Sequence, residues 1–314
     1  GDYANTNLRF AVKEDGEIYF IKSRKNFVDE NGVIYEFYTV NQDGSFTVKS
    51  PIVSSTLKNA VRQTDFQITD HFMYDDYIFT IIEHESDNST AKDITVEQSN
   101  IKDALKQDGY ESTVSVKRHV ETDGDTSDDE EVTDYGNIVN TSKGPAYVYA
   151  EGNTTFKGQL LTGKNAGEEI TLPDPYDLAF TADYILYIDF DKGYYFANEI
   201  GEDVLRRLDI ASGEPLYDGA DDKTIGVAEG INAVMKADED SLFIMGEDEN
   251  NNPVVQVISY DLELRDALAY TGDNEDGLYG FYYVDKNTFM SIEDHEYQRK
   301  TKMKLSFSTY VTNN

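Results

Sequence analysis

The chain contains four segments with one pattern, in which two runs of apolar and aromatic residues flank a short polar turn. They are residues 8–21, 68–82, 231–245 and 278–294. Such runs, joined by turns rich in Asp, Asn and Gly, indicate paired antiparallel strands. A single hairpin cannot bury its apolar face alone, so four copies of the pattern predict a fold that repeats one β unit.

The first 50 residues indicate the size of that unit. Alternating apolar residues predict four strands, at residues 8–13, 17–22, 33–40 and 45–49. The pairs Asp15-Gly16 and Asp43-Gly44 lie between predicted strands and are typical of tight hairpin turns. Four antiparallel strands within about 40–45 residues match one blade of a β-propeller.

Candidate units begin near residues 8, 68, 113 or 145, 177, 231 and 278. We therefore predict an all-β fold with one domain over residues 1–314, a β-propeller of six to seven four-stranded blades. The last unit supplies three strands. We expect residues 2–6 to provide its fourth strand, so that the ring closes between the N- and C-terminal strands.

Residues 83–135 interrupt the pattern. Residues 94–106 have the spacing of a short amphipathic helix, and residues 113–120 resemble a strand again. The run at 121–131 is the most acidic in the chain. We therefore expect an irregular acidic insertion, or a divergent blade, over residues 83–135.

The acidic run offers carboxylates that could hold Ca²⁺. Three of them, Asp123, Asp125 and Asp129, have the spacing of ligands in an EF-hand loop and are the candidates for a metal site. However, Asp128 occupies the position at which that loop needs Gly, and no helix pattern flanks the run. We favour a solvated turn or mobile loop, and we predict no other cofactor.

Charge and cysteine content exclude several classes of protein. The net charge of −34 disfavours nucleic acid and anionic membranes as partners. Without cysteine the chain has neither disulfides nor thiolate chemistry, which fits an exported bacterial protein. No apolar run is long enough for a transmembrane segment. We expect an extracellular, cell-surface or periplasmic location, with a leader or lipid anchor removed ahead of Gly1.

Enzymatic signatures are scarce. The sequence has no GxSxG, P-loop, HExxH or GxGxxG motif, and its many carboxylates form no distinctive pair. Its four histidines are far apart in sequence, at His71, His84, His119 and His295. We interpret them as scattered surface residues, with a shared metal site as the alternative.

The positions of the basic residues are more informative. Some follow the second strand of the first predicted blade and others the second strand of the last, where His295 and Tyr297 add stacking and hydrogen-bonding capacity. The candidate ligand-binding residues are Lys22, Arg24, Lys25, His295, Tyr297, Arg299 and Lys300. Ring closure would bring the two groups together, and we expect them to bind a carboxylate, a phosphate or an acidic sugar. The alternative is ordinary surface ion pairs, which contribute little.

The segment VLRRLDIASGEPLY, at residues 204–217, resembles the third strand, turn and fourth strand of many bacterial propellers. In repeat size, acidity and lack of cysteine, the chain resembles exported or surface lipoprotein β-propellers of Gram-negative bacteria. This resemblance implies capture of a small molecule or glycan for a nutrient-uptake system, with a membrane transporter or surface protein as partner. The alternatives are a glycan-acting hydrolase or lyase with a site in the central funnel, and a scaffold subunit of a surface complex.

Overall fold

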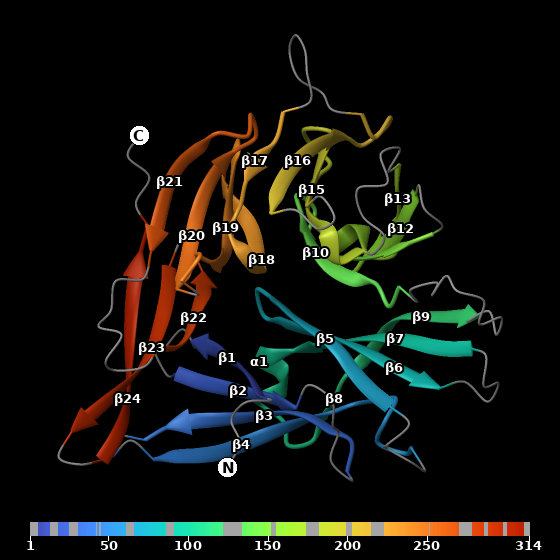
Figure 1. Cartoon of the computed structure of the whole chain (residues 1–314). Coiled ribbons are helices and arrows are strands. Elements are labelled where there is room, and N and C mark those ends of the chain that lie inside the picture. Colours follow the sequence, from blue (N-terminus) through green and yellow to red (C-terminus); the bar gives the residue numbers. More distant parts are fainter. Residues whose placement is uncertain are drawn as a thin grey trace, which may run out of the picture. The chain divides into compact units, whose positions relative to one another are not determined.

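A computed structural model of the chain describes residues 6–12, 18–24, 31–41, 43, 45–60, 66–85, 91–121, 134–151, 155–173, 182–198, 203–214, 223–250, 252–269, 278–285, 288–297 and 300–310. The chain divides into two compact units, unit 1 over Gly1–Asn137 and unit 2 over Ile138–Asn314 (Figure 1). Within each unit, most neighbouring strands of a sheet are antiparallel and consecutive in the sequence, and one parallel pair among the described strands of each unit is an exception.

Unit 1 begins with a meander of four strands, each paired with the next. They are β1 (Thr6–Val12), β2 (Ile18–Arg24), β3 (Val33–Val40) and β4 (Phe46–Val53). A short strand, β8 (Tyr110–Glu111), adds to the sheet in parallel with β4. The four strands predicted for the first 50 residues are therefore confirmed.

The second sheet of unit 1 corrects an expectation from the sequence. Its strands are β5 (Phe66–Tyr74), β6 (Tyr77–Glu85), β7 (Ala91–Asn100) and β9 (Thr113–Glu121). The helix expected over residues 94–106 is wrong, because most of it is strand β7 and the helix α1 covers only Ile101–Ala104. As far as residue 121, the segment expected to be an irregular insertion or a divergent blade supplies the end of β6 and the strands β7 and β9 of this regular four-stranded sheet.

Residues 94–100 form a strand and not a helix because β7 is buried within its sheet. This strand lies between β6 and β9, and it buries Ile94 and Val96, two residues apart, as a strand does. The helix begins only after Asn100, whose side chain accepts a hydrogen bond from the Asp103 N–H at 3.1 Å and so caps it. The acidic run from residue 122, with Asp123, Asp125 and Asp129, lies outside the described residues.

Unit 2 begins with two meanders that share one eight-stranded sheet. The first contains β10 (Asn137–Thr141), β11 (Ala146–Ala150), β12 (Thr155–Leu160) and β13 (Glu169–Pro173). The second contains β14 (Ile185–Asp189), β15 (Tyr194–Asn198), β16 (Val204–Asp209) and β17 (Ile225–Gly226). The two are joined by the first strand of each, because β10 pairs in parallel with β14. Single turns of 3₁₀ helix occur at Gly163–Asn165 and Ala182–Tyr184.

Two further sheets complete unit 2. One contains β18 (Glu229–Asp238), β19 (Ser241–Glu247), β20 (Pro253–Ser259) and β21 (Leu264–Ala269). The other contains β22 (Leu278–Asp285), β23 (Thr288–Tyr297) and β24 (Lys300–Thr309). The predicted all-β class and the four predicted hairpins are confirmed.

The described strands form six meanders, five with four strands and the last with three, and these are the repeating unit that the sequence predicted. The first described residue, Thr6, pairs with Arg24 of β2. Residues 2–5 lie outside the described part of the chain. The fourth strand of the last meander, the closure of the ring and the blade count therefore stay predictions.

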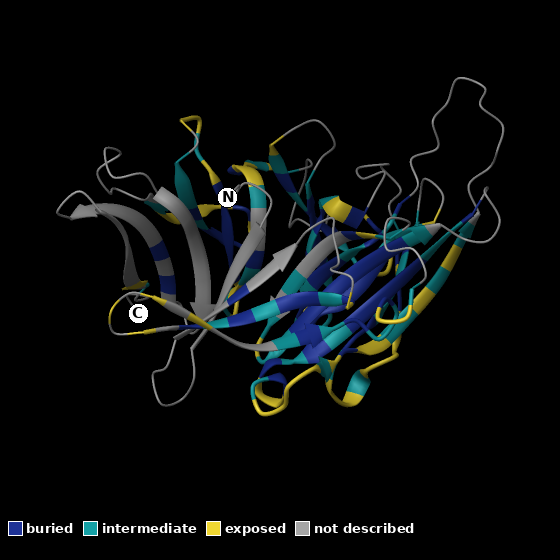
Figure 2. Ribbon diagram, turned by 90° about the horizontal axis from the view of Figure 1, so that it is seen from below, coloured by how far each residue is buried: buried dark blue, intermediate teal, exposed yellow. Residues whose placement is uncertain are grey.

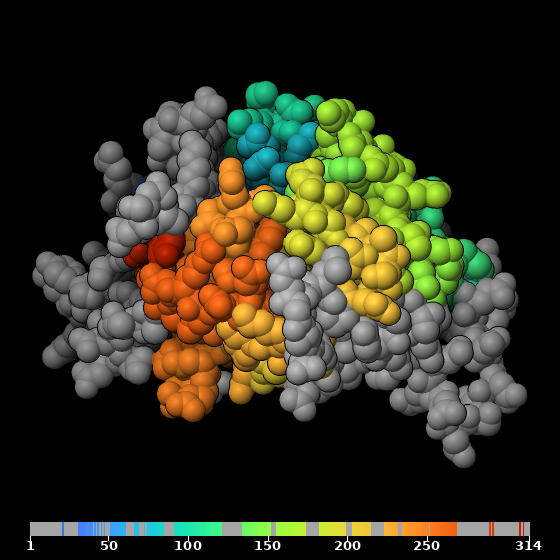
Figure 3. Space-filling view, turned by 90° about the horizontal axis from the view of Figure 1, so that it is seen from above, coloured from blue at the N-terminus to red at the C-terminus, as the bar shows by residue number. Residues whose placement is uncertain are grey.

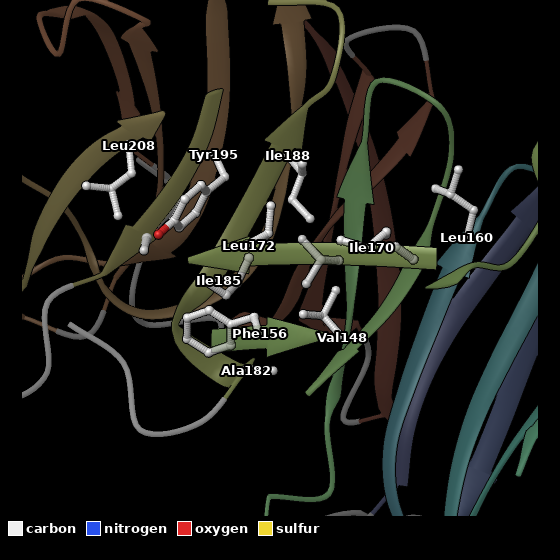
Figure 4. Close-up of a cluster of buried hydrophobic side chains, with 13 residues drawn as sticks. Val148, Phe156, Leu160, Ile170, Leu172, Ala182, Ile185, Ile188, Tyr195 and Leu208 are labelled. Carbon is white, nitrogen blue, oxygen red and sulfur yellow. The ribbon is translucent and has the colours of Figure 1, made fainter. Parts of the chain in front are cut away.

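Buried residues run along the strands and exposed residues gather at the turns (Figure 2). In unit 2, Val148, Phe156 and Leu172 of the first meander share one core with Ile188 and Tyr195 of the second (Figure 4). The other face of the β14–β15 pair packs against β19 and forms a second core. In the space-filling view of Figure 3, these sheets, in yellow and orange, lie against one another. Each meander of the unit thus shares a buried core with the next.

The strand β12 runs so close to β11 that it cannot carry a side chain at Gly158. A Cβ atom there would lie 2.0 Å from the Tyr147 carbonyl oxygen. We therefore expect Gly158→Ala to force the two strands apart and to lower the free energy of unfolding by about 3 kcal/mol. Urea unfolding followed by circular dichroism measures this loss.

The matched control is Gly226→Ala in β17, where the added Cβ would meet its nearest neighbour at an ordinary 3.9 Å. This variant should stay within about 1 kcal/mol of the wild type. Equal stability of the two variants would show that the β11–β12 contact is looser than described.

Candidate functional site

Five of the seven predicted ligand-binding residues lie in described strands. Lys22 and Arg24 lie in β2, His295 and Tyr297 in β23, and Lys300 begins β24. Lys25 and Arg299 lie outside the described residues. The five described residues therefore lie within the second strand of their meander, or at the start of the third, and not in a loop after the second strand, because β2 and β23 extend further than the sequence predicted. The meeting of the two groups at one ligand site stays a prediction.

The described residues bring together a different set of charged and polar side chains, at the turns of unit 2. We call this set the tip cluster. Its members are Lys143, Asp189, Arg207, Lys236 and Tyr260. They lie at or near the ends of β14, β16, β18 and β20 and in the turn after β10, so three consecutive meanders of the unit contribute.

The turn from β14 to β15 positions the central carboxylate, Asp189. Its Oδ1 accepts hydrogen bonds from the backbone N–H groups of Asp191 and Lys192, both at 3.0 Å. The Gly193 N–H then closes the turn on the Asp189 carbonyl oxygen at 2.8 Å, with a φ of 78°. Only glycine adopts that conformation without strain, so the spacing of Asp189 and Gly193 defines this turn.

The second oxygen of Asp189 holds the rest of the cluster. Oδ2 accepts a hydrogen bond from the Tyr260 hydroxyl at 2.6 Å and lies 3.5 Å from Nζ of Lys236. Asp189 is fully buried, whereas the Lys236 side chain is 37% exposed. A buried carboxylate therefore fixes an ammonium group that reaches solvent.

These contacts set the protonation states. Burial alone raises the pKa of Asp189, but the hydrogen bonds from Tyr260 and the Lys192 N–H, with the Lys236 charge, more than offset it and lower that pKa. Burial and the hydrogen bond to Asp189 raise the pKa of Tyr260 far above its ordinary value. At neutral pH the carboxylate is ionised and the phenol is protonated. Neither group exchanges a proton near pH 7, so the arrangement suits electrostatic binding better than acid–base catalysis.

Arg207 supports Tyr260 from the other side. Its Nη1 donates to the Tyr260 carbonyl oxygen at 2.6 Å and to Oδ1 of Asp261 at 3.2 Å. The guanidinium lies 4.3 Å from the centre of the Tyr194 ring, a cation–π contact. Arg207 is buried, so its role is to hold the backbone from which the Tyr260 hydroxyl extends.

Lys143 adds a second ammonium next to the same turn. Its Nζ lies 4.9 Å from the centre of the Phe190 ring and 3.0 Å from Oε1 of Glu168. The Phe190 N–H donates to the Ser142 hydroxyl at 3.1 Å, which ties the two turns together. Lys192, within the Asp189 turn, is exposed. Three lysines thus surround one turn of a strongly acidic chain.

A second buried carboxylate, Glu97 of β7, has a structural role in unit 1. It accepts hydrogen bonds from the hydroxyl groups of Ser54, Ser55, Thr56 and Ser112 and from the Thr56 N–H. Ser54 also caps its own turn, because its hydroxyl accepts from the Leu57 N–H at 3.0 Å. Glu97 therefore joins the segment after β4 to the middle of the next sheet.

Sequence reasoning could have found part of the tip cluster. The turn at 209–213, inside the segment singled out above, has the same Asp-to-Gly spacing as 189–193. There, Oδ1 of Asp209 accepts from the N–H groups of Ala211 and Ser212. The repeat of that spacing marks Asp189 as a turn carboxylate. Lys236 and Tyr260 carry no such signal, because they reach Asp189 from other strands.

No protein-family model matches the sequence, and no curated protein sequence matches it. Among the described residues, no helix is long and apolar enough to cross a membrane.

Several solved structures resemble the chain weakly. The PQQ-bound aldose sugar dehydrogenase of Streptomyces coelicolor is 12% identical, with 98% of this chain and 95% of that chain covered and a TM-score of 0.43. BamB of Moraxella catarrhalis is 8% identical, with 90% and 81% covered and a TM-score of 0.40. Prolyl oligopeptidase B of Galerina marginata is 13% identical, with a TM-score of 0.40; the match covers 96% of this chain but only 42% of that one. These likenesses are too low to assign a family or a function.

The lowered pKa of Asp189 predicts how stability depends on pH. The unfolded chain takes up a proton on this group at a higher pH than the folded chain does. The ionised Asp189 therefore makes its full contribution to the free energy of unfolding above the ordinary Asp pKa of about 4. That contribution is lost as the pH falls below this value. We expect Asp189→Asn to lower the free energy of unfolding by about 3 kcal/mol at pH 7 and by less at pH 3. Urea unfolding across this range measures both values.

The control is Asp191→Asn, two residues along the same turn, where the side chain is exposed. It should change stability by no more than about 0.5 kcal/mol at either pH. A loss in Asp189→Asn that is the same at pH 3 and pH 7 would contradict the ionised state of the buried carboxylate.

The network around Glu97 makes a separate prediction for unit 1. Glu97→Ala leaves several buried hydroxyl groups without their acceptor, so we expect the free energy of unfolding to fall by about 3 kcal/mol. Glu111→Ala removes an exposed carboxylate that pairs with Lys58 and should cost no more than about 1 kcal/mol. Urea unfolding compares the two, and a similar cost for both would rule out the structural role of Glu97.

Proposed function

We propose that this chain is a binding protein that captures an anionic small molecule or glycan without changing it chemically. The observation that carries the proposal is the placement of Lys236. Its ammonium reaches solvent, but its position is fixed by the buried carboxylate of Asp189. A cation that is held in place before binding loses little conformational freedom when an anion arrives, which favours affinity.

The surroundings of Lys236 support an anionic ligand. Lys143 and Lys192 lie at the turn that Asp189 organises, and both side chains reach the surface. On a chain with a net charge of −34, such a local group of cations attracts anions to one place. The protonation states of Asp189 and Tyr260 support binding in preference to proton transfer.

The wider functional expectations stay part of this proposal. They are a cell-surface or periplasmic location, service to a nutrient-uptake system and a transporter or surface protein as partner. The basic residues at the ends of β2 and β23, with Lys22 and Arg24 in the first group, are a second place at which the same class of ligand would bind.

Ligand binding is tested with a panel of acidic sugars and their neutral counterparts: oligogalacturonates, glucuronate, sialic acid and sugar phosphates. We expect at least one anionic member to bind in isothermal titration calorimetry, more weakly as salt concentration rises. Lys236→Ala should weaken that binding about tenfold or more, the loss of one charge-assisted hydrogen bond. Lys102→Ala in unit 1, which removes an exposed lysine paired with Asp76, is the matched control and should bind as the wild type does.

Three other outcomes decide against parts of the proposal. Equal binding of neutral and acidic sugars would contradict an electrostatic site. Loss of affinity in Lys22→Ala or Arg24→Ala, but not in Lys236→Ala, would place the ligand at the residues predicted from the sequence. Cleavage of a bound glycan, followed by chromatography, would favour the hydrolase or lyase alternative.

A further inference from the structure

Four residues occupy one rung across the second sheet of unit 1. Phe66 of β5 pairs with His84 of β6, His84 pairs with Asp93 of β7, and Asp93 pairs with His119 of β9. These four strands lie side by side in Figure 1. Residues directly opposite each other in antiparallel strands project to the same face, with Cβ atoms about 4.5–5.5 Å apart. Two histidines therefore flank one aspartate on one face of the sheet.

Two of these three polar side chains, Asp93 and His119, are already in contact. Nδ1 of His119 lies 2.6 Å from Oδ1 of Asp93, and the side chains are 52% and 36% exposed. His84 is half-buried, and its ring stacks on Phe66 with the centroids 5.0 Å apart and the planes at 30°. The His84 ring thus lies against its apolar neighbour Phe66, on the side away from Asp93.

We propose that His84, Asp93 and His119 form a binding site for a divalent transition metal ion, with Zn²⁺ as the expected occupant. Imidazole nitrogens and a carboxylate oxygen are ligands that Zn²⁺ takes at about 2.0–2.2 Å. Neighbouring strands lie about 4.8 Å apart, so the two histidines stand roughly 10 Å apart at the backbone. Imidazole rings that lean inward from both sides reach a point above Asp93.

Binding requires one rearrangement. Among the described residues, no group of three or more such side chains is already placed to hold a metal ion. His84 must turn from Phe66 toward Asp93, and the ion then replaces the direct contact between Asp93 and His119. Both movements are side-chain rotations at the end of a sheet whose strands stay in register. Three protein ligands would leave the fourth position of the ion to water.

The choice of ion follows from the ligand chemistry. The chain has 61 acidic residues, so Ca²⁺ and Mg²⁺ have many oxygen ligands elsewhere on its surface. Two imidazole nitrogens on one rung discriminate against these hard ions and in favour of Zn²⁺ or Co²⁺. A titration with Zn²⁺ in excess Ca²⁺ and Mg²⁺ therefore isolates the histidine site from the acidic surface.

The test measures Zn²⁺ binding by calorimetry under these conditions, and Co²⁺ binding by its visible absorption. We expect one ion per chain. His119→Ala, Asp93→Asn and His84→Phe should each weaken binding about tenfold or more, since each removes a ligand. His84→Phe keeps an aromatic ring against Phe66, so its effect reports the lost nitrogen and not the lost stacking. His71→Ala is the control, because His71 pairs with Thr80 on another rung of the same sheet.

The proposal fails if the wild-type chain binds no Zn²⁺ in excess Ca²⁺ and Mg²⁺. It also fails if His119→Ala and Asp93→Asn weaken binding but His84→Phe does not, because the ion would then bind only the pair that is already in contact. Circular dichroism of each variant confirms that the sheet is folded, and the conservative His84→Phe and Asp93→Asn keep the test decisive if His119→Ala is unstable.

Discussion

The fold of this chain depends on strands that are buried on both faces. In β19, residues 241–246 are all buried. Leu242 and Ile244 face a core shared with β14–β16, whereas Phe243 and Met245 face another that contains Phe289 of β23. Because side chains alternate along a strand, one strand supplies two cores. A buried side chain of this kind contributes about 1.5–3 kcal/mol, so each sheet of unit 2 owes much of its stability to its neighbours.

Packing on both faces leaves little room for function along the middle of a strand. The groups of charged side chains that reach the surface therefore lie at strand ends and turns, whereas the buried Glu97 within β7 has a structural role. The tip cluster forms where β14, β18 and β20 end, and the rung with Asp93 and His119 lies near the end of its sheet. Asp189 connects the buried interior with the surface, because its side chain is fully buried and yet holds a turn at the surface. Its contacts explain how a cation can be fixed on an acidic protein.

Local signals predicted the fold well, and the candidate site poorly. The alternation and turn chemistry of residues 8–49 and 278–294 gave the correct strands, because hairpins are short-range structures. The helix expected over residues 94–106 was wrong, because the two neighbouring strands decide the conformation of β7. Tyr260 lies 71 residues from Asp189, and Lys236 lies 47 residues away. No local pattern records contacts at such separations.

The twin turns at 189–193 and 209–213 bear on how a repeat protein acquires new sites. Both use one oxygen of an aspartate to hold the turn, and both close on a glycine with positive φ. At Asp189 the other oxygen also binds Tyr260 and Lys236, residues of the next sheet. Because the turn uses only one oxygen of its aspartate, the other oxygen can accept a hydrogen bond from elsewhere. A donor on an adjacent meander can then use that acceptor, as Tyr260 and Lys236 use the second oxygen of Asp189.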